Sequence, residues 1–143
     1  MSVDVLDTVR HPRVPLERHG WVAVALALGS ALAYGALIVL PYYVNGLNGV
    51  PLAEVAGGGH DPKDLWPMAS PIAAPYRIAG LFMVMLTPLI AMAVLMWAAF
   101  QLFLTGSTAR SRALAATAAG ISLGVLAWHA TPLGQALGSW MLD

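Results

Sequence analysis

Cysteine is absent from this sequence of 143 residues. Its absence excludes disulfide bonds, thiolate metal sites, cysteine nucleophiles and covalent attachment of c-type haem. Charge is also scarce, because charged residues make up 10% of the chain, against about 25% in an average soluble domain. The formal net charge is zero, so the chain has no basic field that could hold a nucleic acid. We therefore expect no nucleic-acid partner.

Motifs that identify enzymes are missing as well. The sequence contains no G-x-S-x-G nucleophile elbow, no phosphate-cradling glycine loop and no dinucleotide-binding fingerprint. It also lacks H-E-x-x-H and similar spacings of zinc-binding histidines. From these absences we predict that the protein is not an enzyme and holds no cofactor.

Apolar residues dominate what is present: they make up 59% of the chain, and the mean hydropathy is +0.73. They gather in three runs, at about 20–40, 78–104 and 113–131. A helix needs about 20 apolar residues to cross the hydrocarbon core, and in lipid every backbone amide must find its partner within such a helix. The sequence therefore predicts an all-α integral membrane protein, built as a single domain of three transmembrane helices.

A cleaved signal peptide is the alternative interpretation of the first run. Its apolar stretch exceeds the 7–15 residues of a signal core, and its small-residue pattern Ala31-Leu32-Ala33 lies in the middle of the run. We interpret it as a retained anchor. The abundance of alanine, and of arginine over lysine, indicates a bacterial source and hence the plasma (inner) membrane, crossed several times.

The distribution of basic residues predicts the orientation of the three helices. Five arginines flank the ends that would share one side of the membrane: Arg10, Arg13, Arg18, Arg110 and Arg112. The long connection 41–77 holds only Lys63 and Arg77. The positive-inside rule then places the arm 1–19 in the cytoplasm. The connection 41–77 becomes an extracytoplasmic loop, and the tail 132–143 lies outside or at the interface.

The stretch GGGHDPKDLWPM, residues 57–68, concentrates the polar chemistry of the chain. Asp61 before Pro62 is typical of a helix N-cap followed by the first helical position. Asp64, three residues after Asp61, resembles the second half of a capping box, and Pro67 penalises further helix. We interpret the stretch as a flexible turn, one capped helical turn and a stop.

The same stretch could also hold a metal ion or a substrate outside the membrane. His60, Asp61 and Asp64 offer one nitrogen and two carboxylates, and His129, near the outer end of the third helix, could approach them. A zinc site needs three or four such ligands. His129 has a second interpretation, as an ordinary histidine at the membrane interface beside Trp128.

Small residues recur at four-residue spacing on two predicted helices. One set contains Gly29, flanked by Ala25 and Ala33, and the other contains Gly120 and Gly124, preceded by Ala116. Such faces let helix backbones approach closely in lipid. We expect the two faces to pack against each other within the monomer, with contact to another subunit as the alternative.

Pro88 falls inside the second apolar run, which is longer than the membrane is thick. Proline cannot donate to the carbonyl of Val84, so we predict a kink at Pro88, with Thr87 as a substitute donor.

The three spans carry no Asp, Glu, Lys or Arg, and three helices enclose almost no interior. Ion and proton pathways usually contain an ionisable residue, so a solitary transporter is disfavoured. We expect an accessory or assembly subunit that contacts the lipid bilayer and binds other membrane subunits, or itself, through small-residue helix faces and the 41–77 loop. The alternative is a homo-oligomeric channel or carrier with a kinked second helix, and a metal or substrate site at residues 60–64 ranks third.

Overall fold

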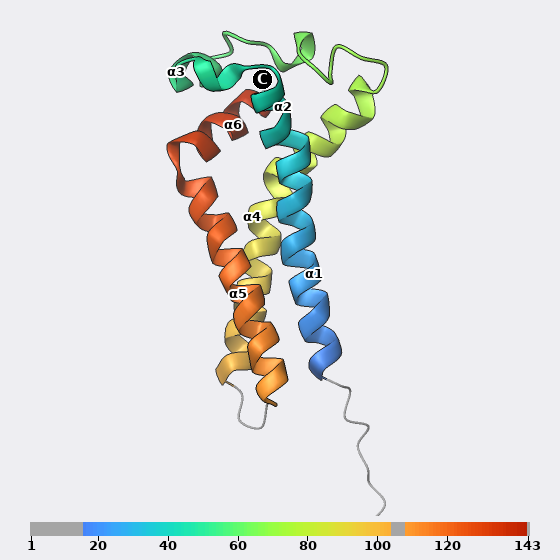
Figure 1. The fold of residues 1–143 in the computed structure, drawn as a ribbon, viewed down its shortest axis with the longest axis vertical. Helices are drawn as coiled ribbons and strands as arrows, with labels where there is room; N and C mark the ends of the chain where they lie inside the picture. The colour runs from blue at the N-terminus through green and yellow to red at the C-terminus, as the bar shows by residue number, and fades with distance from the viewer. Residues whose placement is uncertain (1–15, 104–107, 143) are drawn as a thin grey trace, which may run out of the picture.

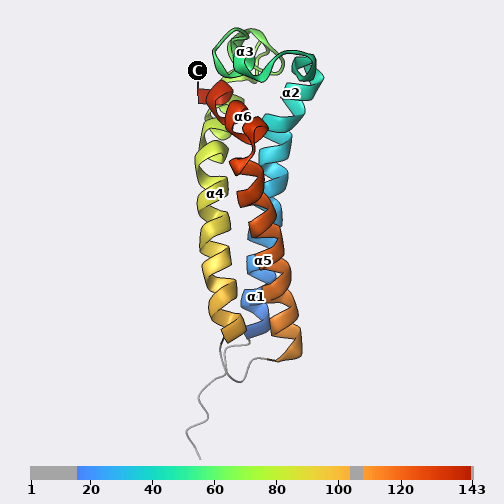
Figure 2. The ribbon, with the colours of Figure 1, turned by 90° about the vertical axis from the view of Figure 1, so that its left-hand side faces the viewer.

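Three long helices lie side by side and carry a cap of short helices at one end (Figure 1, Figure 2). The computed structural model describes residues 16–103 and 108–142, and within these ranges every regular element is helical. The long helices are α1 (Leu16–Tyr34), α4 (Ala73–Phe103) and α5 (Ala109–Ala130), and each contacts the other two. Most of the predicted arm 1–19 lies outside the described residues.

The three apolar runs of the sequence are confirmed as helices long and apolar enough to cross a membrane. The first span, Arg18–Val44, outlasts the predicted range 20–40 because α1 continues through a π-helical segment, η1 (Gly35–Val39), into α2 (Leu40–Val44). Helix α4 begins five residues before the predicted start at 78, and α5 begins at 109 rather than 113. The chain therefore has the make-up of a multi-pass membrane protein.

Small side chains fill the contacts between the three long helices. The buried residues of these helices include Ala23, Ala27 and Ser30 of α1, Ala91, Val94 and Ala98 of α4, and Ala115, Ala118 and Ser122 of α5, beside the larger Thr87, Gln101 and Leu114. Small residues allow close backbone approach, which is the usual basis of helix association in lipid. In the most apolar 18-residue window of each span, less than a third is buried inside the chain. Most side chains of the three long helices therefore lie on the outside of the bundle.

The connection 41–77 is an ordered helical cap rather than a long loop. After α2 it forms η2 (Leu47–Gly49), α3 (Leu52–Ala56) and η3 (Pro62–Asp64) before α4 begins at Ala73. The tail predicted at 132–143 is a further helix, α6 (Pro132–Leu142), which turns back beneath α3 (Figure 1). Both corrections have one cause, because the two segments bury their apolar residues against each other.

The cap has its own hydrophobic core at the junction with the bundle. Its buried members are Tyr34, Ile38, Tyr42, Leu47, Val55, Met68, Leu137, Trp140 and Met141. Burying a valine- or leucine-sized side chain contributes about 1.5–3 kcal/mol, so a core of this size fixes the cap on the helix ends.

A sharp corner between α5 and α6 directs the last helix back over the bundle. Thr131 adopts an extended conformation, and its Oγ1 accepts a hydrogen bond from the backbone N–H of Gly134 at 3.0 Å. Pro132 occupies the first position of α6, where its missing N–H costs nothing. A Cβ added at Gly134 would overlap the backbone carbonyl of Trp128, so the corner requires glycine there.

The passage from α1 to α2 contains a proline that interrupts the backbone hydrogen bonds. Leu40 donates to the carbonyl of Gly35 in the π pattern, but Pro41 has no N–H to continue the series. Tyr76 of α4 supplies the missing donor, because its hydroxyl lies 2.6 Å from the Leu37 carbonyl oxygen and 3.2 Å from that of Ala36. The Tyr76 hydroxyl thereby links α4 to η1 at the point where Pro41 leaves a backbone hydrogen bond unmade.

Helix α4 runs through Pro88 as one element of 31 residues. The substitute donor expected from the sequence is used elsewhere, because the Thr87 hydroxyl donates to Sδ of Met83 at 3.9 Å rather than to the Val84 carbonyl. Thr87 is fully buried, and the Met83 sulfur serves as the acceptor of its hydroxyl. A kink at Pro88 stays a prediction.

Candidate functional site

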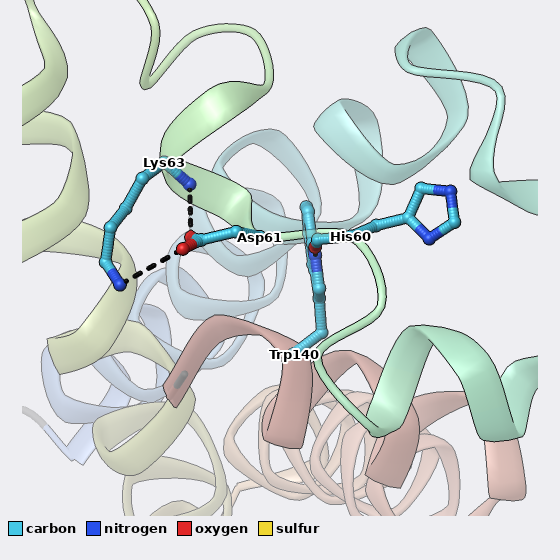
Figure 3. A network of polar contacts seen from close by, with 4 residues as sticks. All are labelled: His60, Asp61, Lys63 and Trp140. Atoms are coloured by element: carbon cyan, nitrogen blue, oxygen red, sulfur yellow. Dashed lines mark hydrogen bonds and ion pairs between the residues drawn. The ribbon is translucent and has the colours of Figure 1, made fainter.

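Residues 57–68 form the turn and cap predicted from the sequence. The Asp61 carboxylate accepts a hydrogen bond from the Lys63 backbone N–H at 2.9 Å and lies 3.3 Å from the Lys63 ammonium (Figure 3). Pro62 and Lys63 then lead the short 3-10 helix η3. The stretch therefore has a structural explanation in its own local contacts.

These contacts also set the pKa of Asp61. The backbone N–H of Lys63 lowers it most, partial desolvation opposes this, and the Lys63 ammonium lowers it further. Because the pKa is lower in the folded chain, the stabilisation is complete above the ordinary aspartate pKa of about 3.9. It is lost as the pH falls through the lowered value.

Two longer-range contacts fasten the stretch to the rest of the cap. The indole N–H of Trp140, on α6, donates to the His60 carbonyl at 2.8 Å. Figure 3 shows the two residues next to each other. Asn45 holds Trp66 from both sides, since its amide donates to the Trp66 carbonyl at 2.7 Å and accepts from the Trp66 N–H at 3.1 Å. The stretch is thus held over the helix ends by residues far away in the sequence.

The structure does not bring the candidate metal ligands together. The His60 imidazole points away from Asp61 (Figure 3). Its Nδ1 lies 3.6 Å from a carboxylate oxygen of Glu54. Asp61 is engaged with Lys63, and Asp64 forms the end of η3. Among the described residues, no three side chains of the metal-binding types gather into a group that could hold an ion.

His129 lies in the last turn of α5 and faces α1 instead of the 57–68 stretch. Its ring packs against that of Tyr34 with centroids 4.7 Å apart. Its Nδ1 lies 2.9 Å from the Val125 carbonyl oxygen, which can only accept, so Nδ1 carries the proton and Nε2 is an acceptor in the neutral ring. His129 is half-buried, and its position at a membrane interface stays a prediction.

The three glycines predicted to pack helices lie on the outside of the bundle. Gly29, Gly120 and Gly124 are exposed, and a Cβ added at any of them would meet no atom within 4 Å. The interpretation that they join the first and third spans within the monomer is therefore wrong. Other small residues, such as Ala27 and Ala118, make the contacts instead, because α1 and α5 are rotated to present those faces. Contact of the glycine faces with another subunit stays a prediction.

A groove lies between α1 and α5, and no feature of the sequence predicted it. Its volume is about 600 Å³, and its surface is almost wholly apolar. Thr87 of α4 forms part of its floor. Its walls include Tyr34, Gly35, Tyr43, Gly124, Trp128 and His129. The π-helical segment η1 therefore borders the groove on one side, and the end of α5 borders it on the other.

Three buried polar atoms belong to residues that line this groove, and none of them makes a hydrogen bond of good geometry to a described residue: Oη of Tyr34, Nε1 of Trp128 and Nε2 of His129. The Tyr34 hydroxyl and the Trp128 indole lie close enough for a weak hydrogen bond to each other. An unsatisfied buried group costs about 1–3 kcal/mol, and hydrocarbon would offer none of them a partner. Tyr34 and His129 lie far apart in the sequence, and no local signal predicts that they meet.

The comparisons with known proteins add no relative to this description. No protein-family model matches the sequence, and no curated protein or solved structure is significantly similar to it.

Proposed function

We propose that this protein is an accessory or assembly subunit of a larger complex in the plasma (inner) membrane. The observation that carries the proposal is the exposure of the small-residue faces containing Gly29 and Gly120. The monomer leaves both faces unused, although such faces are the usual means by which helices associate in lipid. A partner helix could therefore approach either backbone closely.

The orientation supports a role for the cap in the same complex. Arg110 and Arg112 belong to the end of the bundle opposite the cap, so the positive-inside rule places the cap outside the cytoplasm. The cap exposes Trp66, with 48% of its surface accessible, beside the fixed turn of η3. An exposed tryptophan whose backbone is fixed by Asn45 suits contact with an extracytoplasmic partner or with lipid headgroups.

A pore within one copy of the chain is disfavoured by the packing. The long helices pack closely through mostly small buried side chains, and α4 carries no charged residue between Ile78 and Phe103. A channel or carrier would therefore need a ring of several copies. Its presence is one outcome of the experiment that follows.

The test is affinity purification of the full chain in mild detergent, with native mass determination and metal analysis on the same sample. We expect a heterologous partner at fixed stoichiometry. Gly29→Leu and Gly120→Leu should each reduce its recovery at least several-fold, because a leucine on a small-residue face holds the partner helix away. Ala93→Leu, an exposed position on α4, is the matched control and should retain the partner.

Two results would contradict the proposal. A self-assembled ring of fixed size would instead support a homo-oligomeric channel or carrier. A monomer with no partner in both wild type and Ala93→Leu would remove the basis for an accessory role.

A further inference from the structure

We propose that a pocket between the cap and the start of α4 binds a phosphate group, and that a phospholipid of the leaflet on the cap side supplies it. The residues that line the pocket are Lys63, Met68, Ala73, Ala74 and Arg77, and its volume is about 300 Å³. The inference takes the three spans to cross a membrane, and it does not depend on the small-residue faces proposed for a partner.

The pocket gathers two basic residues from different parts of the chain. Between positions 20 and 109 the sequence holds no lysine or arginine besides Lys63 and Arg77. Lys63 belongs to η3 in the cap and Arg77 belongs to α4, yet both line this one pocket. An ammonium and a guanidinium on the same pocket favour an anionic ligand, and phosphate is a group that both bind well.

The position of Arg77 sets the depth of the pocket in the membrane. Arg77 is exposed near the start of the second candidate span, and α4 carries no charged residue from Ile78 onward. An exposed charge is costly within the hydrocarbon and is tolerated where the side chain reaches the interface. The pocket therefore lies at the level of the lipid headgroups, where phospholipids carry their phosphate groups.

The nearby carboxylates leave both cations able to bind an anion. Neither Asp61 nor Asp64 lines the pocket, although the Asp61 carboxylate lies 3.3 Å from the Lys63 ammonium (Figure 3). The pKa of Asp61 is lowered mainly by the Lys63 backbone N–H, and Arg77 makes the last of the smaller contributions. An ammonium has three donors, so Lys63 can keep Asp61 and also donate to a phosphate oxygen. The planar fork of Arg77 suits two oxygens of the same phosphate.

The remaining surface favours a lipid over inorganic phosphate. The other lining residues, Met68 among them, are apolar. Ile72 and Ile78, which lie next to the lining residues Ala73 and Arg77 in the chain, are each 56% exposed and offer apolar surface to acyl chains. Inorganic phosphate would contact the two cations and leave this apolar surface uncovered, whereas a phospholipid would cover both.

The test measures the Tm of the full chain in a mild nonionic detergent with three probes: dioctanoyl phosphatidylglycerol, dioctanoylglycerol, which lacks the phosphate, and inorganic phosphate. A ligand that binds the native state raises its Tm. We expect phosphatidylglycerol to raise Tm and the other two probes to leave it unchanged at the same concentration. Arg77→Gln should weaken the apparent affinity for phosphatidylglycerol about 5-fold, as expected for one basic residue at an anionic lipid surface. Arg18→Gln removes an exposed charge at the opposite end of the bundle and should bind like wild type.

Ala74→Leu separates the pocket from its charges. This variant keeps both cations but fills the pocket from an exposed position, so it should weaken phosphatidylglycerol binding at least as much as Arg77→Gln does. Its control is Ala93→Leu, an exposed position on α4 that does not line the pocket. Circular dichroism checks that the variants fold, and Arg77→Gln decides the matter if Ala74→Leu does not.

Four results would overturn the proposal. An equal rise of Tm with dioctanoylglycerol would show that the phosphate is not recognised, and an equal rise with inorganic phosphate would remove the lipid as its source. Binding by folded Ala74→Leu as in wild type would show that the lipid lies outside the pocket. An equal loss of affinity in Arg77→Gln and Arg18→Gln would show general attraction to positive charge rather than a site.

Discussion

Replacing Tyr76 by phenylalanine should destabilise the protein, because the Tyr76 hydroxyl donates where Pro41 has no N–H. Tyr76→Phe removes a single oxygen, and with it the hydrogen bond of 2.6 Å to the Leu37 carbonyl and the longer one to the Ala36 carbonyl. A buried carbonyl left without a donor costs about 1–3 kcal/mol. Because the Tyr76 hydroxyl is only half-buried, we expect the free energy of unfolding to fall by about 1–1.5 kcal/mol.

A double-mutant cycle tests the stated cause of that loss. Pro41→Ala restores a backbone N–H, which can then donate to the carbonyls that Tyr76 serves. In the Pro41→Ala background, Tyr76→Phe should therefore cost less, with a coupling of about 1 kcal/mol between the two positions. Reversible unfolding in mixed micelles, followed by circular dichroism as dodecyl sulfate is added, measures each corner of the cycle.

The matched control is Tyr43→Phe, an exposed tyrosine on α2. Its removal of a hydroxyl should leave stability within about 0.5 kcal/mol of wild type, as for most surface changes. Equal cost of Tyr76→Phe with and without Pro41 would refute the reasoning, because the hydroxyl would then not be replacing the missing backbone donor.

Further predictions concern the glycines and the fastening of the cap. Gly134→Ala should lower the free energy of unfolding by about 1–3 kcal/mol, because the new Cβ overlaps the Trp128 carbonyl. Gly120→Ala should raise it by up to about 1 kcal/mol, because the new Cβ meets no atom and alanine favours helix over glycine. The same unfolding assay measures both. Trp140→Phe loses the bond to the His60 carbonyl and leaves a cavity in the cap core, so it should cost at least about 2 kcal/mol and speed amide hydrogen exchange in residues 57–68. Unchanged exchange there would show that this bond does not hold the stretch.

The three spans could be predicted from the sequence because hydropathy alone identifies segments long and apolar enough to cross a membrane. Long uncharged apolar runs have one outcome in lipid, and the structure has helices at all three. The turn at Asp61 was also predictable, since its cap is formed by neighbours in the chain. Both successes depend on local information only.

The cap and the groove could not be predicted because they depend on contacts between distant segments. Nothing near Leu137 or Trp140 indicates that α6 buries them against residues of α2, η2 and α3. Alanine occurs on several faces of the long helices, so spacing could not tell the buried face with Ala118 from the exposed one with Gly120. The rotation of each helix in the bundle makes that choice, and it also brings His129 against Tyr34.

The cap core has a consequence for the order of events during biosynthesis. Residues 41–72 emerge early, yet the core that organises them contains Leu137, Trp140 and Met141. The N-terminal segments of a chain are made first, so the early part of the cap must wait with apolar surface uncovered until the last helix arrives. A chain that stops before residue 137 lacks these three members of the cap core, so we expect limited proteolysis to cut its residues 41–72 faster than those of the full chain.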